Sequence, residues 1–389
     1  MTDIHYSPKP TKGNHIRHGR ARKINTAYIV GAGFSWYAGL PLQEKFTSEL
    51  LEPIKDKNNP DYALVRYLAE FIKAVFDHSR SAPAKYWPNL EDIFTCIDMA
   101  ANTGHHLGFD FPPSRLRTVR RALLTRIITM LHNNYGRARD EDSFHWRQLR
   151  NFIRRVRVND SAFISMNWDT VIEQRISELR EIDNFDYRCR AVASDFPSNG
   201  QAVERLRARV GVALPVIKIH GSINWLYCDS CRGLYSFPAA QSATIASQLL
   251  SPEEWKQIDP AHVSGNHWCC SRCKGVSLGT RIATFSYLKA LDFPLFQLSW
   301  FSAERVLRDA KRWVFIGYSL PSADYEFKYL LKRIQISRKV RPEIVLVTGG
   351  SHPDATYRNY QRFFGRVMDR KNGYFPRGLS KNAVERITE

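Results

Sequence analysis

Short apolar runs recur along the chain, and each ends in glycine or polar residues. The runs are AYIV at 27–30, SAFISM at 161–166, PVIKIH at 215–220, RWVFIGY at 312–318 and PEIVLVTG at 342–349. Tracts with helical spacing of apolar residues lie among the later runs, at 169–180, 300–311 and 322–337. Apolar strands that alternate with helices indicate a parallel sheet covered on both faces, so we predict an α/β, Rossmann-like fold.

Residues 42–157 show mainly helical periodicity. Apolar side chains at helical spacing predict helices at 62–76, at 115–131 and around 146–157, and Pro41 is expected to open a helix through Leu50. The stretch KYWPNLEDIF at 85–94 is expected to be a loop. We therefore predict that 42–157 is a mainly helical insertion in the α/β domain.

These patterns divide the chain into predicted units. We expect a sheet domain made of 25–225 and 280–350, which includes the helical insertion, and a small zinc-ribbon module at 226–279. A basic tail at 1–24 precedes them, and a C-terminal extension at 351–389 follows.

Positive charge is concentrated in two of these segments. The chain has 57 Lys and Arg against 38 Asp and Glu, a net charge of +19. Residues 115–157 hold 12 arginines against three acidic residues, and the first 23 residues are also basic. Such a distribution fits contact with nucleic acid or an acidic partner, and equally a solvated helix face beside a basic tail.

The sequence favours a cytoplasmic protein. No run of about 18 apolar residues is present to span a membrane. The N-terminal stretch MTDIHYSPKPTKGNHIRHGRARK lacks the apolar core of a secretory signal.

Five of the seven cysteines cluster in YCDSC and WCCSRC. Two C-x-x-C pairs without a secretion signal favour zinc over disulfides, because each pair converges two thiolates on one tetrahedral site. We predict the ligands Cys228, Cys231, Cys270 and Cys273, although spacing alone leaves Cys269 open as the alternative to Cys270. Four thiolates leave no open position, so the metal is expected to be structural.

Polar residues and glycines follow the ends of the predicted strands. The first strand ends in Gly31-Ala32-Gly33, but a G-x-G-x-x-G fingerprint fails because position 36 is Trp36. The later strand ends carry four further polar or glycine-rich groups: Asn167-Trp168-Asp169, His220-Gly221-Ser222, Gly317-Tyr318-Ser319 with Asp324 beyond, and Thr348-Gly349. Ligands of parallel sheets bind beyond these ends, so we expect one polar pocket lined by all five loops. A serine hydrolase is disfavoured, because a nucleophile elbow around Ser319 needs glycine where Pro321 stands.

Together these motifs resemble a known family. GAGFSWYAGLP, SMNWDT, KIHGS followed by paired C-x-x-C, and GYSLPSAD occur in the order found in sirtuin-like proteins. The chain is most similar to prokaryotic sirtuin-like proteins of anti-phage defence, which cleave NAD. The resemblance implies that the glycine turn cradles the NAD phosphates, and that the later loops contact the rest of the cofactor. The implied NAD-binding residues are Gly31, Ala32, Gly33, Phe34, Ser35, Gly317, Tyr318, Ser319, Asp324, Thr348 and Gly349.

The departures from the family bear on the reaction. Protein-deacylating sirtuins continue G-I-P-D-F-R after the glycine turn, whereas here Gly39-Leu40-Pro41 is followed by Leu42-Gln43-Glu44. They also carry glutamine in T-Q-N-I-D, where this chain has Met166. Both losses fall on the nicotinamide and acyl-lysine side of the site, so the resemblance implies NAD hydrolysis rather than deacylation.

The predicted activity is an NAD glycohydrolase that depletes NAD as an effector of anti-phage defence. Asn167 is expected to hold the nicotinamide ribose or the attacking water, His220 to act as general base and Asp169 to orient the site. An NAD-dependent deacylase and a non-catalytic NAD-binding regulatory subunit are the alternatives.

The predicted partners follow from the resemblance and the charge. The resemblance implies a homo-oligomer and a partner defence protein, such as an ATPase or a nucleic-acid-guided sensor. The arginine-rich helices are candidates for nucleic-acid contact.

Overall fold

The computed structural model describes most of the chain after the N-terminal tail. The described residues are 23–52, 54–59, 61–77, 86–180, 185–195, 203–204, 213–228, 230–262, 268–275, 278–279, 294–350, 352–365 and 369–389. The predicted basic tail at 1–24 therefore lies outside them except for its last two residues.

A seven-stranded sheet forms the centre of the molecule, with strand order β12-β11-β10-β1-β2-β6-β3. Every pairing in it is parallel. The strands are β1 (Thr26–Val30), β2 (Ser161–Ser165), β3 (Phe185–Asp186), β6 (Leu214–Lys218), β10 (Arg312–Ile316), β11 (Glu343–Val347) and β12 (Tyr374–Phe375). This sheet confirms the predicted Rossmann-like α/β class, and its five central strands coincide with the five apolar runs.

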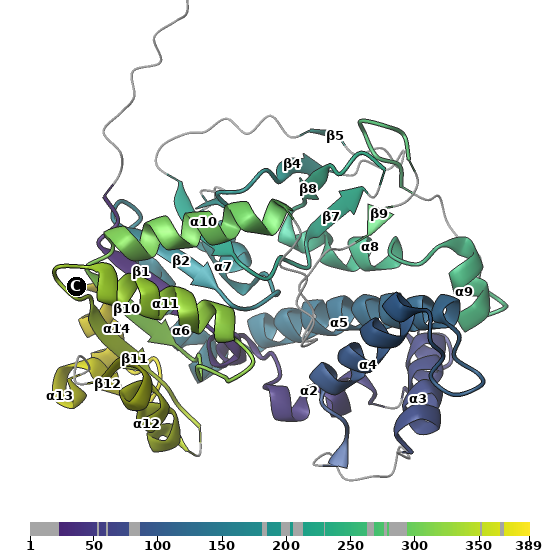
Figure 1. The fold of residues 1–389 in the computed structure, drawn as a ribbon, viewed down its shortest axis with the longest axis horizontal. Coiled ribbons are helices and arrows are strands. Elements are labelled where there is room, and N and C mark those ends of the chain that lie inside the picture. The colour runs from purple at the N-terminus through teal and green to yellow at the C-terminus, as the bar shows by residue number, and fades with distance from the viewer. Residues whose placement is uncertain are drawn as a thin grey trace, which may run out of the picture.

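Alternating residues of the strands enter two separate cores. On β1, Ala27 and Ile29 lie in one core, while Tyr28 and Val30 lie in the other. The first core is completed by α10 (Pro294–Asp309), α11 (Tyr325–Ser337) and α12 (Pro353–Phe364). The second is completed by α6 (Phe144–Arg155), α7 (Val171–Arg180) and α14 (Lys381–Thr388). Helices thus cover both faces, as Figure 1 shows, which is why the strands are mainly apolar.

The helices of 42–157 lie largely to one side of the sheet (Figure 1). They are α2 (Gln43–Leu50), α3 (Tyr62–Phe76), α4 (Leu90–Thr103) and the long α5 (Pro113–Glu141), whereas α6 covers a face of the sheet. The predicted loop at 85–94 is wrong in its second part, because α4 begins at Leu90. Glu91 and Asp92 favour the N-terminus of this helix, and its buried face follows helical spacing.

A second, five-stranded sheet has the order β5-β4-β8-β7-β9 and lies above α5 in Figure 1. Its strands are β4 (Val192–Asp195), β5 (Val203–Glu204), β7 (Trp225–Cys228), β8 (Leu234–Ser236) and β9 (Leu278–Gly279). The connections include η3 (Ala239–Gln241), α8 (Ser242–Ser247) and α9 (Pro252–Ile258). The cysteine pairs belong to this sheet and its turns.

The residues after 351 join the sheet domain, although the sequence predicted no elements for them. The short helix α13 (Arg370–Gly373) precedes β12, which pairs with β11 through Tyr374 and Leu346. Tyr28 Oη on β1 donates a hydrogen bond to the Ile387 carbonyl at 2.8 Å, so the last helix is anchored on the central strand.

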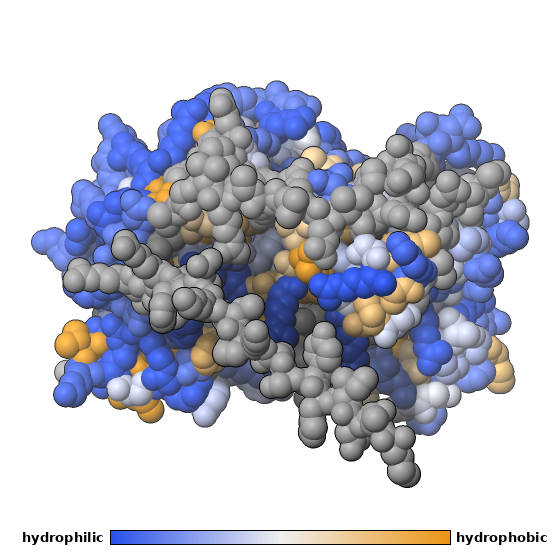
Figure 2. Space-filling model, turned by 90° about the horizontal axis from the view of Figure 1, so that it is seen from above, coloured by the Kyte–Doolittle hydropathy of each residue, from blue (hydrophilic) through white to orange (hydrophobic). Residues whose placement is uncertain are grey.

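Hydrophilic residues predominate on the face seen in Figure 2, where hydrophobic residues occur in small groups. Within the described part of the chain, no helix combines the length and the apolar character needed to cross a bilayer.

Candidate functional site

The sheet has a topological switch point between β1 and β10. From β1 the order runs through β2 and β6 in one direction, and from β10 through β11 and β12 in the other. The turns that follow two such strands diverge, and they leave a crevice at the carboxyl edge of the sheet. The short helices α1 (Ala32–Ser35) and η1 (Trp36–Ala38) follow β1 at this edge.

A cavity of about 600 Å³ lies at this switch point. This volume is within the usual range of about 300–1,000 Å³ for small-molecule sites. The turns after β1, β10 and β11 supply Ala32, Gly33, Gly317, Tyr318, Ser319, Thr348 and Gly349, all predicted to bind the cofactor. Further lining comes from η1, the start of α2, α12 and the turn after β12, with Trp36, Tyr37, Leu42, Gln43, Glu44, His352, Thr356 and Gly378.

Two glycine turns pack against each other at the base of the cavity. Gly33 N donates to the Gly317 carbonyl at 2.9 Å. A Cβ at Gly317, whose φ is +61°, would lie 2.3 Å from the Gly33 carbonyl carbon, and one at Gly31 would lie 2.7 Å from Tyr318 Cα. The glycines are thus required by the contact between the turns, independently of any ligand.

Several predicted residues are not among the described residues that line this cavity. They are Gly31, Phe34, Ser35, Asn167, Asp169, His220 and Asp324. Phe34 is fully buried in the core beneath the turn. We expected one pocket lined by all five loops. Among the described residues, the loops after β1, β10 and β11 line this cavity together with further segments, and the loops after β2 and β6 do not.

Asn167 and Asp169 are nevertheless joined directly to the glycine turn. Asn167 Nδ2 donates to Ser35 Oγ at 2.8 Å, and Ser35 Oγ donates to Asp169 Oδ2 at 2.6 Å. Asp169 Oδ1 also accepts from Val171 N at 3.0 Å and thereby fixes the start of α7. The Asp169 carboxylate fixes the Ser35 hydroxyl, and this hydroxyl in turn accepts from Asn167 Nδ2. The orientation of the Asn167 side chain therefore depends on Asp169.

His220 is buried beside the same loop. Its Nδ1 lies 3.1 Å from the Met166 carbonyl oxygen. A carbonyl only accepts hydrogen bonds, so this contact requires the proton on Nδ1 and leaves Nε2 as the basic nitrogen of the neutral ring.

The side chains of Tyr318 and Asp324 form a buried hydrogen bond with each other. Tyr318 Oη donates to Asp324 Oδ2 at 2.8 Å, and Tyr360 Oη donates to the Tyr318 carbonyl at 2.7 Å. Burial, reinforced by the Asp324 charge, raises the pKa of Tyr318 far above its ordinary value. The Tyr318 hydroxyl is therefore neutral and holds the loop in place.

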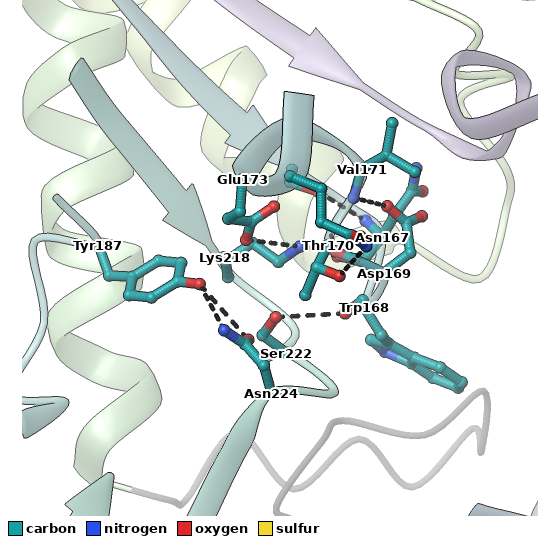
Figure 3. Close-up of polar contacts among 12 residues, drawn as sticks. Asn167, Trp168, Asp169, Thr170, Val171, Glu173, Tyr187, Lys218, Ser222 and Asn224 are labelled. Carbon is teal, nitrogen blue, oxygen red and sulfur yellow. Dashed lines mark hydrogen bonds and ion pairs between the residues drawn. The ribbon is translucent and has the colours of Figure 1, made fainter. Parts of the chain in front are cut away.

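A buried ion pair, which the sequence analysis missed, clamps the loop of Asn167 and Asp169 (Figure 3). Lys218 Nζ lies 3.4 Å from Glu173 Oε1, and both side chains are only 1% exposed. Lys218 also donates to the Asp169 carbonyl, and Ile223 N donates to the Trp168 carbonyl at 2.9 Å. The segment that carries His220 and the segment that carries Asn167 are thereby held together.

The cysteine sulfurs of Cys228, Cys231, Cys270 and Cys273 all lie within 4.8 Å of one another. Two of the Sγ–Sγ distances are 3.5 Å, from Cys228 to Cys273 and from Cys231 to Cys270. With Zn–S bonds of about 2.3 Å, a tetrahedral site needs sulfurs about 3.8 Å apart, so the group fits Zn²⁺. Cys270, and not Cys269, belongs to this group, which resolves the alternative that spacing left open.

The two cysteine turns share one backbone form. Arg232 N donates to the Cys228 carbonyl at 2.9 Å, and Lys274 N donates to the Cys270 carbonyl at 3.0 Å. Arg232 and Lys274 both have φ of +60°. The repeated pattern C-x-x-C-[RK]-G, with Gly233 and Gly275 in its last position, was a sequence signal that identifies Cys270 as the partner of Cys273.

Most arginines of 115–157 have carboxylate partners within the chain. Eight of the twelve form ion pairs of 4.0 Å or less: Arg120, Arg121, Arg126, Arg139, Arg147, Arg150, Arg155 and Arg157. Four of these pairs join α5 or α6 to another helix or its cap, and the other four are local along the chain.

Fold and site define a parallel α/β protein with a cavity at the switch point of its central sheet and a four-cysteine group that fits Zn²⁺. No protein-family model matches the chain, and no curated protein matches it. Solved structures of similar fold include one described as "Structural Basis for the Mechanism and Regulation of Sir2 Enzymes". It is 12% identical with a TM-score of 0.39, over 94% of this chain and 91% of that chain. Another, described as "Sir2-p53 peptide-NAD+", is 11% identical with a TM-score of 0.34, over 93% and 92% of the two chains. Likenesses this low do not indicate what this chain binds.

Proposed function

We propose that this protein binds NAD⁺ in the switch-point cavity and hydrolyses it to nicotinamide and ADP-ribose. The observation that carries the proposal is the link between the cavity and the polar cluster beside it. Ser35, in the glycine turn, accepts from Asn167 and donates to Asp169. A cofactor seated on that turn would therefore lie beside the loop that carries Asn167. The order of the sirtuin-like motifs supports the same assignment.

The chemistry of the cavity is compatible with a dinucleotide. Its described lining offers backbone groups of two glycine turns, the Trp36 indole, and the hydroxyls of Ser319 and Thr348. Backbone amides at such turns are suited to phosphate oxygens. Hydroxyls and apolar surface suit a ribose and a planar base.

The proposed reaction replaces the bond from the ribose C1′ to the nicotinamide nitrogen with a bond to a water oxygen. The electron pair of the broken bond returns to the nicotinamide ring, which leaves neutral. Asn167 Oδ1 would accept a hydrogen bond from the ribose or the water. His220 Nε2 would take the water proton, since Nδ1 faces the Met166 carbonyl.

The test is nicotinamide release from NAD⁺ by the purified protein and by His220→Ala and Asn167→Ala variants. We expect each variant to lose activity by about 10²-fold or more, as removal of a general base or of a transition-state contact does. His105→Ala, an exposed residue after α4, is the control and should behave like the wild type. Equal release by wild type and His220→Ala, under every condition in which the wild type is active, would contradict the catalytic assignment.

A deacylase would use the same cavity, and its product distinguishes this activity from NAD hydrolysis. Incubation with NAD⁺ and an acyl-lysine peptide would yield O-acyl-ADP-ribose and a peptide that is lighter by its acyl group. NAD hydrolysis yields free ADP-ribose whether or not the peptide is present. A non-catalytic NAD-binding subunit would bind the cofactor and release no nicotinamide.

The cysteine group would hold a structural zinc ion in this protein. Its four thiolates would complete the coordination of the ion, so it would stabilise the second sheet. The ion takes no part in the proposed reaction.

A role as a cytoplasmic effector of anti-phage defence follows from the motif resemblance, as do a homo-oligomer and a partner ATPase or nucleic-acid-guided sensor. We propose these together with the activity. Sedimentation of the chain alone and with candidate partners, read beside the nicotinamide assay, tests them.

A further inference from the structure

The C-terminal segment forms part of the rim of the switch-point cavity. Gly378, in the turn after β12, lines the cavity together with Thr348 and Tyr37. Thr348 N donates to the Phe375 carbonyl at 3.0 Å, and Gly378 N donates to the Thr348 carbonyl at 2.7 Å. The turn after β12 and the turn after β11 are thus hydrogen-bonded in both directions.

The same segment also holds the opposite rim. Leu379 N donates to Tyr37 Oη at 2.8 Å, a contact between residues 342 positions apart in the chain. Tyr37 lies in η1, directly after the glycine turn, and its side chain is buried. The position of this ring beside the cavity therefore depends on Leu379.

Gly378 is the point at which the two rims meet. Its φ is +61°, and a Cβ there would lie 1.8 Å from Tyr37 Oη and 3.1 Å from Tyr37 Cζ. Any side chain at this position must displace either the Tyr37 ring or the turn itself. The hydroxyl causes most of the clash, because without it the nearest atom is only slightly too close.

The segment is anchored at its far end by α14. Ser380 caps this helix, and Val384 and Ile387 are buried in the core that contains Tyr28 and Val30. The wall is therefore continuous with a helix packed on the central strand.

We infer that residues 375–379 form a wall of the ligand site, with Gly378 and Tyr37 as its positioning residues. Nucleotide binding and docking of the C-terminal segment then stabilise each other, because coupling between two events is reciprocal. The ligand class, the ADP-ribose part of NAD⁺, rests on the proposed function. The wall itself does not.

The experiment compares Gly378→Ala, Tyr37→Phe, the double variant and Gly104→Ala. Gly104 has φ of +79°, and a Cβ added there would meet no atom within 4 Å, so its variant carries backbone strain without the clash. Calorimetry with NAD⁺ and with ADP-ribose measures the binding constant. We expect Gly378→Ala to weaken binding about tenfold or more and Gly104→Ala by less than about twofold, in line with typical coupling between sites.

The double variant separates a specific clash from general unfolding. Removing the Tyr37 hydroxyl should restore part of the affinity that Gly378→Ala loses. If the two substitutions acted independently, their losses of binding free energy would add in the double variant. Additive losses, or wild-type affinity in Gly378→Ala, would overturn the inference.

Hydrogen exchange of the free protein tests the wall without any ligand. Gly378→Ala should speed exchange at 36–42 and 346–350, and Gly104→Ala should not. If the wild type binds neither NAD⁺ nor ADP-ribose, the proposed function is wrong. The exchange rates alone then test whether residues 375–379 form the wall. Unchanged exchange in Gly378→Ala would overturn it.

Discussion

Cys270→Ser is expected to abolish zinc binding, whereas Cys269→Ser should keep about one zinc ion per chain. The sulfur of Cys270 lies within the group of four, and the sulfur of its neighbour does not. A serine hydroxyl does not ionise as a thiolate does, so three ligands remain and the site opens. Metal analysis of the purified variants measures the ratio directly.

Loss of the zinc ion should also destabilise the second sheet. β7 ends at Cys228, and β9 pairs with it through Leu278, so the positions of both strands depend on the two cysteine turns. Because structural zinc contributes its binding free energy to folding, proteolysis near 225–279 should accelerate in Cys270→Ser and in chelator-treated wild type. Zinc retained in Cys270→Ser and lost in Cys269→Ser would contradict the assigned ligand set.

Lys218→Met is expected to lower the free energy of unfolding by about 3–5 kcal/mol. Lys218 and Glu173 form an ion pair in which both side chains are 1% exposed. Removing the ammonium leaves a buried carboxylate without its counter-charge, and that costs far more than an exposed pair would. Urea unfolding measures the change.

Two variants control this prediction. Lys218→Met combined with Glu173→Met should recover most of the stability, since no uncompensated charge remains, with a residual loss of about 1 kcal/mol for the Asp169 carbonyl. Arg66→Met breaks an exposed pair with Glu70 and should change stability by less than about 1 kcal/mol. A loss this small in Lys218→Met as well would show that the buried pair is not critical.

The pH dependence of Lys218→Met has a definite sign. Burial raises the pKa of Glu173, and the Lys218 charge opposes this rise. Without Lys218 the folded-state pKa rises further above the unfolded value, so the folded protein favours the protonated carboxyl. The stability deficit relative to the wild type should therefore grow as the pH rises above the ordinary pKa of a glutamate.

The sequence predicted the framework of this protein well. Five apolar runs became the five central strands, because strands buried on both faces are predominantly apolar, and that signal is local. The second part of the predicted loop at 85–94 is wrong because Pro88 and Asn89 resemble turn residues, yet they precede a helix whose apolar spacing continues to Ile97.

The site was predicted in part. Gly33, Gly317 and Thr348 meet at one cavity because parallel strands end at the same edge of a sheet. The link from Ser35 to Asn167 and Asp169 joins residues more than 130 positions apart and has no local pattern. Lys218 was hidden in an apolar strand, where only its burial beside Glu173 identifies its role.

By itself, the sequence determined the strand positions, the two cysteine pairs and the glycine turns, because periodicity and short spacing act within a few residues. Tertiary structure decided that Cys270 completes the metal group, that Gly31 and Gly33 are needed against Gly317, and that the turn at Gly378 walls the cavity. These are contacts between segments distant along the chain, and their energies depend on how the sheet and helices bring the segments together.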